Sequence, residues 1–198
     1  MTAFQTSPLA PTRKAASFAI RAERASDIVA REALLDACFG DNRHLRACHC
    51  LRDGRLPAEG LAFSAARGRK LLGTLRLWHV SAGGVPALLL GPLAVDNACR
   101  GLGVGAALMD HALAAARARG HRAVLLLGDA PYYARFGFSA ERTGELALPA
   151  AFEPERLLAL ELIEGALDGA WGMIVPTGTM APRPVRAGKV ARLIPRTA

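Results

Sequence analysis

Three glycines at alternate positions, Gly101, Gly103 and Gly105, lie between an apolar segment and a long alanine-rich segment. Because glycine lacks a Cβ, the backbone there can adopt positive φ and approach a ligand closely. N–H groups at the start of the following helix would point at that ligand, and the helix dipole favours negative charge in the same place. Arg100 adds a full positive charge beside the turn. The pattern predicts a phosphate or pyrophosphate site; its alternative is a flexible loop with a helix cap.

Two other phosphate-binding loops share part of this pattern. Gly101-x-Gly103-x-x-Ala106 fits the relaxed dinucleotide fingerprint, and Asp129 follows the next apolar run, near where that fingerprint has an acidic residue. A dinucleotide fold opens with this unit, however, whereas here a long stretch of helix and strand precedes it. A Walker loop requires Gly-Lys-Ser/Thr, which does not follow the turn. Both alternatives are therefore disfavoured.

The chain before the turn predicts a strand, two helices and an antiparallel meander. Residues 18–23 alternate apolar and polar, as in a half-buried strand. Ser26 suits the N-cap of a helix whose apolar stripe runs from Ile28 to Cys38, and a second helix is expected over residues 42–52. Three strand-like runs then follow, over residues 61–66, 71–80 and 87–95.

After the turn the periodicity becomes helical. Residues 103–119 place apolar side chains on one face, and Gly120 suits the helix end. The continuous apolar run 123–127 is typical of a strand buried on both faces, so it forms a βαβ unit with residues 87–95. A short helix (131–136) and two strands (157–163 and 171–175) complete the prediction. The fold class is therefore α+β, with a mixed, mostly antiparallel sheet and one parallel pair flanked by helices.

The composition is that of a globular chain. It is 52% hydrophobic and 21% charged, and 198 residues fit one domain. Its apolar runs fall short of the roughly 20 residues that span a bilayer. Residues 1–16 lack the apolar centre of a secretory signal. We expect a cytoplasmic protein without a membrane partner.

The formal net charge of +8 is concentrated at the two ends of the chain. Residues 1–16 and 176–198 contain basic residues and no acidic ones, so the segment between them is nearly neutral. We expect a loosely ordered extension over residues 1–16, a single domain over 17–175 and a basic, proline-containing tail over 176–198. The basic tail lacks interleaved aromatic residues, which argues against a nucleic-acid partner.

The four cysteines do not have the density of a disulfide framework. Cys48-His49-Cys50 has two metal-ligand types in sequence, but a second ligand pair at a suitable spacing is lacking. Reduced, partly buried thiols are the better interpretation, and no metal is expected.

Two motifs around the predicted βαβ unit carry a resemblance to a known family. Arg100-x-x-Gly103-x-Gly105, after Leu93-Ala94-Val95-Asp96, resembles the acyl-CoA-binding motif of the GNAT N-acetyltransferase superfamily. Residues 132–138, Tyr-Tyr-Ala-Arg-Phe-Gly-Phe, are similar to that family's Tyr-x-x-x-Gly-Phe segment. The segments 90–95 and 128–133 are particularly similar in sequence to the YhbS-type branch of this family. The resemblance covers residues 18–175, which are thus expected to form an acyl-CoA N-acyltransferase-like domain with acetyl-CoA as co-substrate.

The resemblance also implies where CoA binds. The strand ending at Val95 would splay from the strand 123–127 and hold pantetheine between them. Backbone N–H groups near Leu93, Ala94 and Val95 would bond the pantetheine amides and the thioester carbonyl. Arg100 and the turn would take the pyrophosphate, through the backbone of Gly101, Leu102, Gly103, Val104, Gly105 and Ala106.

Tyr133 matches the family's general acid, which donates to the departing CoA thiolate, with Tyr132 as its rival. The general base is left open. Asp96, His79 and Asp129 are candidates, and a water chain is equally suitable. His44, His49 and His121 have no arrangement in the sequence that suggests chemistry. The family's common asparagine before this tyrosine is missing, which puts one cofactor contact in doubt.

The sequence therefore predicts an enzyme that transfers an acetyl group from acetyl-CoA to a primary amine of an unidentified acceptor. The alternative is a non-catalytic acyl-CoA-binding or interaction module on the same fold. A homodimer is compatible with the sequence but has no positive signal in it.

Overall fold

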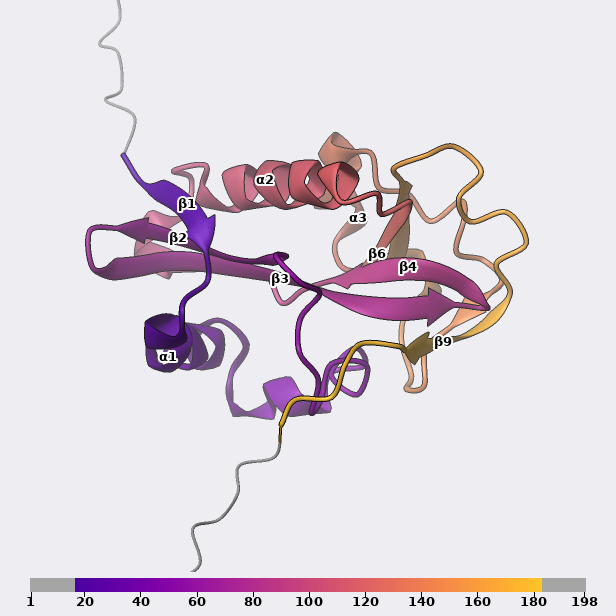
Figure 1. Ribbon diagram of the computed structural model, residues 1–198, viewed down its shortest axis with the longest axis horizontal. Coiled ribbons are helices and arrows are strands. Elements are labelled where there is room, and N and C mark those ends of the chain that lie inside the picture. The colour runs from indigo at the N-terminus through magenta and orange to yellow at the C-terminus, as the bar shows by residue number, and fades with distance from the viewer. Residues whose placement is uncertain (1–16, 183–198) are drawn as a thin grey trace, which may run out of the picture.

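The computed structural model describes residues 17–182, in which a twisted sheet separates two layers of helix (Figure 1). The strand order is β1-β2-β3-β4-β6-β8, with β5 and β9 also paired to β3, and β7 paired to β9. The strands are β1 (Ala19–Ala22), β2 (Ala62–Arg67), β3 (Lys70–Ala82), β4 (Val85–Leu90), β5 (Ala94–Val95), β6 (Ala123–Leu127), β7 (Leu146–Ala147), β8 (Leu157–Glu161) and β9 (Gly172–Pro176). Every pair is antiparallel except β4–β6 and β7–β9.

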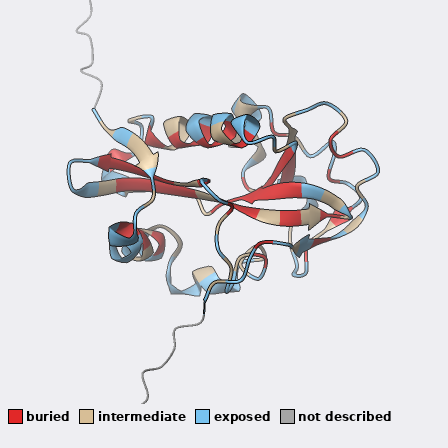
Figure 2. Cartoon of the chain, viewed as in Figure 1, coloured by how far each residue is buried: buried red, intermediate tan, exposed pale blue. Residues whose placement is uncertain are grey.

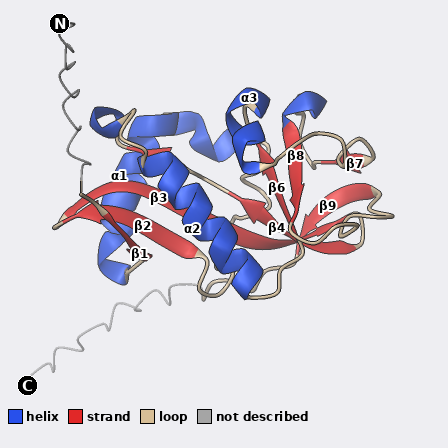
Figure 3. Cartoon of the chain, turned by 90° about the horizontal axis from the view of Figure 1, so that it is seen from above, coloured by secondary structure: helices blue, strands red, loops and turns tan. Residues whose placement is uncertain are grey.

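Three α-helices accompany the sheet in the described part of the chain. In Figure 1, α2 (Val104–Ala118) lies on one face and α1 (Ile28–Phe39) on the other, while α3 (Ala130–Tyr133) follows β6. Seen from above, α2 crosses the strands obliquely (Figure 3). The predicted α+β class, the meander and the parallel pair formed across α2 are confirmed.

The core consists of two apolar clusters, one on each face of the sheet. The cluster under α2 joins Leu108 and Met109 of the helix to Leu88, Val124 and neighbouring strand residues. Alternate residues of the same strands, such as Leu89 and Leu125, face the opposite cluster. Figure 2 shows the resulting band of buried residues along the strands and the inner face of α2. A strand that contributes to both clusters must be apolar throughout, which explains the unbroken apolar run of β6.

The single strand predicted over residues 87–95 is wrong, because the structure divides it into β4 and β5. Gly91 has φ +131°, a conformation reserved for glycine, and Pro92 has no N–H to donate to a sheet. The Trp78 indole N–H donates to the Gly91 carbonyl at 2.6 Å, and Gly91 N–H donates to Arg76 at 2.8 Å. The break is therefore held in place by β3, and β5 resumes pairing further along that strand.

The predicted N-cap at Ser26 is also wrong. Ser26 lies in a 3₁₀ turn (Ala25–Asp27), and α1 begins at Ile28. The buried Asp27 carboxylate accepts the Arg24 N–H at 2.9 Å and pairs with Arg21, so it takes the capping role that sequence reasoning gave to serine. The predicted apolar stripe is only partly buried: Leu35 is buried, whereas Ile28 is 46% exposed.

The helix predicted over residues 42–52 is replaced by a 3₁₀ helix (Asp41–Leu45) and a series of turns. Backbone bonds join His49 to Arg46 and Arg52 to His49, each spanning three residues instead of four. Tight turns of this kind bring neighbouring side chains to one side of the segment, which lies beneath the sheet in Figure 1.

The chain continues in contact with the domain past the predicted boundary at residue 175. Thr177 N–H donates to His79 at 3.1 Å, and Ala181 N–H donates to Gly54 at 2.8 Å. The remainder of the predicted tail, and the N-terminal extension over residues 1–16, lie outside the described residues. The division of the chain into three regions stays a prediction.

Candidate active site

A cavity of about 630 Å³ opens where β4 and β6 diverge. The two parallel strands are paired only at Leu88–Val124 and Leu89–Leu125, and their carboxyl ends then separate. The walls of the cavity come from both faces of the sheet. Leu126 and Tyr133 belong to the cluster under α2, whereas Cys48 and Phe152 belong to the cluster on the opposite face. The cavity therefore passes between the strands, and its volume suits a small-molecule site.

The glycine turn has the geometry expected of an anion site. Gly101 and Gly103 have φ of 76° and 79°, so any other residue would be strained there. Gly103 is the N-cap of α2, and because it has no side chain it cannot accept the N–H groups at the start of the helix. The N–H groups of residues 103–106 find no acceptor within the described chain, whereas Leu102 N–H donates to Cys99 at 3.2 Å. Four unpaired donors at a helix N-terminus favour a phosphate, with the exposed Arg100 beside them.

β5 presents one backbone edge away from β3. Asp96 N–H donates to the Leu72 carbonyl at 2.8 Å. Because N–H groups alternate along a strand, Ala94 N–H also faces β3, whereas Val95 N–H faces away. The Val95 carbonyl accepts the Cys38 thiol at 3.4 Å on that outer side. Of the three predicted donors, Val95 is thus free to bind a ligand, Ala94 is used by the sheet, and Leu93 lines the cavity.

Tyr133 stands in the cavity wall beside the diverging strands. Its ring packs edge-on against Tyr132 and Phe138, and a Cβ at position 128 would overlap it, so Gly128 is needed for close approach rather than for its backbone angles. Burial raises the pKa of Tyr133 to about 12, so its hydroxyl remains a proton donor throughout the physiological range.

Tyr132 lies on the other side of the pair and contacts the glycine turn. Its hydroxyl is 3.1 Å from the position that a Cβ on Gly105 would occupy. The Arg135 guanidinium lies over the Tyr132 ring, 4.7 Å from its centre. The two adjacent tyrosines therefore face different parts of the site, Tyr133 the cavity and Tyr132 the start of α2.

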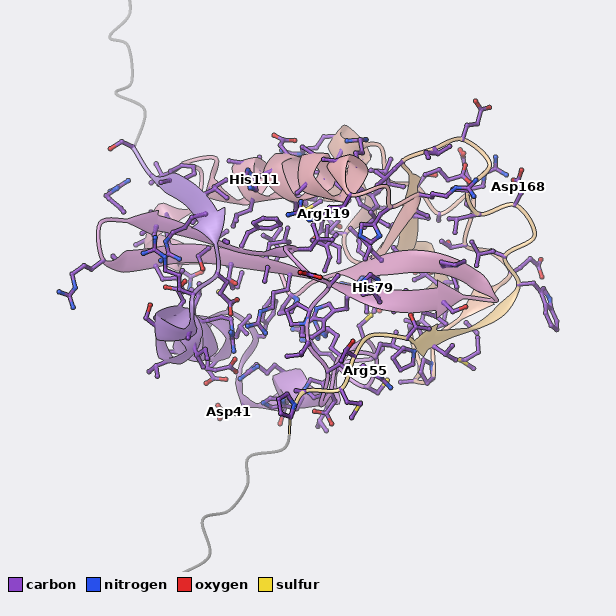
Figure 4. The ribbon with its side chains drawn as sticks, in the orientation of Figure 1. Asp41, Arg55, His79, His111, Arg119 and Asp168 are labelled. Atoms are coloured by element: carbon purple, nitrogen blue, oxygen red, sulfur yellow. The ribbon has the colours of Figure 1, made fainter. Side chains whose placement is uncertain are left out.

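None of the three predicted base candidates lines the cavity that Tyr133 faces, although the Asp129 carbonyl accepts the Tyr133 N–H at 3.1 Å. Asp96 forms an ion pair with Lys70 at 2.8 Å, which lowers its pKa. His79 lines a second cavity, of about 390 Å³, together with His121 and Arg119. Figure 4 labels His79 on the sheet and Arg119 near the end of α2. Asp129 is exposed at the start of α3. The described residues that line the larger cavity include none of these three side chains. The geometry therefore does not favour Asp96, His79 or Asp129 as the base.

A histidine pair that sequence reasoning passed over lies at this cavity instead. His49 is part of its lining, and its Nε2 is 2.8 Å from His44 Nδ1. Burial, together with the charge of Arg52, lowers the pKa of His49, so the imidazole is neutral near pH 7 and able to accept a proton. The sequence offers no local signal for this role, because the turns of residues 46–54 alone bring His49 to the cavity.

Neither a metal centre nor a membrane span is found between residues 17 and 182. That part of the chain has no group of three or more His, Cys, Asp or Glu side chains arranged to hold a metal ion. Burial raises the pKa of the Cys48 thiol to about 11, which keeps it protonated. Within the same residues, no helix is long and apolar enough to cross a bilayer.

Comparison with known proteins agrees with this fold. Residues 58–140 match the family described as "Acetyltransferase (GNAT) domain". The chain is 30% identical over 162 residues to the uncharacterized N-acetyltransferase YhbS of Escherichia coli (strain K12), covering 78% of this chain and 93% of that protein. The chain belongs to the GNAT acetyltransferase family, a family of acetyl-CoA-dependent acyltransferases. The resemblance noted in the sequence is confirmed.

Two solved structures show the same architecture. E. coli YhbS, crystallised in complex with CoA, matches with a TM-score of 0.71 and 28% identity over 85% of this chain and 94% of that one. A GNAT family acetyltransferase from Brucella melitensis, in complex with acetyl-CoA, matches with a TM-score of 0.57 and 26% identity over 85% of this chain and 97% of that one.

Proposed function

We propose that this protein transfers an acetyl group from acetyl-CoA to a primary amine by direct attack in a ternary complex. The observation that carries the proposal is the cavity between the diverging ends of β4 and β6, with Tyr133 in its wall. Related proteins crystallised with CoA and with acetyl-CoA support the choice of donor.

The donor's binding site follows from the unpaired backbone groups. The N–H groups of residues 103–106 and the Arg100 guanidinium would hold the pyrophosphate at the start of α2. Pantetheine would then run along the free edge of β5, where Val95 N–H faces outward. An N–H directed at the thioester oxygen stabilises the negative charge that develops there as the amine attacks.

The chemical step needs one group that donates a proton and one that accepts a proton. The amine nitrogen bonds to the acetyl carbon, the carbon–sulfur bond breaks, and the departing sulfur takes a proton from the Tyr133 hydroxyl, which regains a proton from solvent. We assign the proton released by the amine to His49, because it lines the same cavity and its lowered pKa keeps it neutral. His44, exposed and hydrogen-bonded to His49, offers that proton a route to solvent.

The alternative is a protein that binds acyl-CoA without turnover. Isothermal titration with acetyl-CoA tests the binding site, and release of free thiol with a library of primary amines tests catalysis. Binding together with amine-dependent thiol release supports the transferase. Binding without thiol release for any amine would instead favour the non-catalytic module, and the absence of binding would contradict both.

A further inference from the structure

The wall of the larger cavity on the α1 side is cationic. Four arginines line the cavity against a single carboxylate, with the neutral His49 among them: Arg43, Arg46, Arg52, Arg156 and Glu153. Net positive charge inside a concave, partly apolar site raises the local potential far more than the same charges would on an open surface. The cavity is therefore suited to a ligand that carries negative charge.

Two of these arginines are neutralised by neighbouring carboxylates. Arg43 pairs with Glu32 at 2.5 Å and with Asp36 at 2.6 Å. Arg156 lies 3.5 Å from Glu153, the one carboxylate in the lining. These pairs leave little charge for a ligand.

The other two arginines have no carboxylate partner in the described residues. The Arg46 guanidinium lies over the Phe39 ring, 4.8 Å from its centre. The side chain of Arg52 makes neither an ion pair nor a hydrogen bond with the described part of the chain. Burial lowers the pKa of Arg52, and the charges of Arg43 and Arg46 lower it further. A half-buried guanidinium without a counter-charge is costly, so its retention calls for a ligand that supplies one.

Arg52 also lies at the reacting end of the cavity. Its Nη1 is 3.6 Å from the position that a Cβ on Gly91 would occupy, at the break between β4 and β5. Pro92 and Leu93, which follow that break, line the same cavity. An anion on Arg52 would thus be held beside the point where the strands separate, and away from the phosphate-binding start of α2.

We propose that the acceptor is a small amine that also carries a carboxylate, and that Arg52 binds this carboxylate with Arg46 beside it. The planar guanidinium fork matches a carboxylate in two parallel hydrogen bonds. This inference rests on the proposed transferase function, because it names the substrate class of the same site.

The test compares pairs of amines in which a carboxylate is replaced by a neutral amide of nearly the same size. The CoA-bound protein is titrated with L-amino acids and with the corresponding L-amino acid amides, and thiol release from acetyl-CoA is measured with the same pairs. The wild type is expected to bind the carboxylates about 10- to 100-fold more tightly than the amides. Arg52→Gln should abolish this preference, and Arg52→Lys should restore part of it. The affinity for acetyl-CoA should not change in either variant.

Arg117→Gln, in the last turn of α2, removes the same charge away from both cavities and should retain the preference. Equal binding of amides and carboxylates, binding of neither, or a preference that survives Arg52→Gln would overturn the inference. A loss of acetyl-CoA affinity in Arg52→Gln, alongside the loss of carboxylate preference, would overturn it too, because Arg52 would then bind acetyl-CoA. Carboxylate-selective binding without thiol release would support the acceptor site and contradict the transferase, so the two failures are distinguishable.

Discussion

Replacing Tyr133 with phenylalanine removes one hydroxyl from the cavity wall and leaves the ring in place. The ring packs against Phe138 and over Gly128, and both contacts survive the substitution. The free energy of unfolding should therefore change by less than about 1 kcal/mol. Turnover should fall, because the departing sulfur loses its proton donor.

The size of the effect follows from the two ionisable groups involved. General acid catalysis contributes about 10²- to 10⁴-fold. A thiol has a pKa of about 8.5, so the thiolate departs fairly readily without help, which favours the lower end of that range. We expect kcat to fall about 100-fold, equivalent to about 2.7 kcal/mol. With its pKa raised to about 12, the Tyr133 hydroxyl stays protonated as the pH rises to 10, so it should not limit the wild-type rate there.

The assay measures initial rates of thiol release at saturating acetyl-CoA, and isothermal titration measures the affinity for acetyl-CoA. Tyr132→Phe is the matched control, since it removes a hydroxyl from the neighbouring residue of α3, where that hydroxyl faces the start of α2. It should change the affinity for acetyl-CoA more than kcat. A Tyr133→Phe enzyme within twofold of wild-type kcat, or a kcat loss found in Tyr132→Phe instead, would refute the reasoning.

Three further predictions concern the turn, the base and the stability of the fold. Gly103→Ala and Gly120→Ala should each lower the free energy of unfolding by about 1 to 2 kcal/mol, because both glycines have positive φ. Isothermal titration should show weaker acetyl-CoA binding only in Gly103→Ala. With His49 as the base, kcat/KM should fall as the pH drops through a value below 6.5, and a pH profile of His49→Gln that keeps this limb would exclude the residue. Arg21 holds the pKa of Asp27 well below 3.8, so the ionised carboxylate stabilises the fold above about pH 4. Urea unfolding of the wild type should show this stabilisation lost on acidification. Asp27→Asn should lack it at every pH.

The glycine turn to which we assign the pyrophosphate was predictable because its determinants are local. Positive φ at alternate glycines, a helix start directly after them and a nearby arginine are properties of one short segment, and the structure has each of them. The same holds for the parallel pair across α2, since an amphipathic helix between two apolar runs leaves few other arrangements. The break at Gly91 was visible as Gly-Pro, but its consequence, a separate β5, depends on the anchoring bonds from Trp78 and Arg76.

The part of the site proposed to bind the acceptor could not be predicted from the sequence. Residues 42–52 have a composition compatible with helix, yet successive three-residue turns bring His49 and Arg52 to a cavity whose other walls come from β4, β6 and α3. Which of two adjacent tyrosines faces that cavity likewise depends on the packing of Tyr133 over Gly128. The sequence by itself determined the family, the order of most of the strands and helices, and the glycine turn before α2, because these follow from local backbone preference and periodicity. Only the tertiary structure decided which charged and titratable side chains meet at the reacting end, because those contacts join segments far apart along the chain.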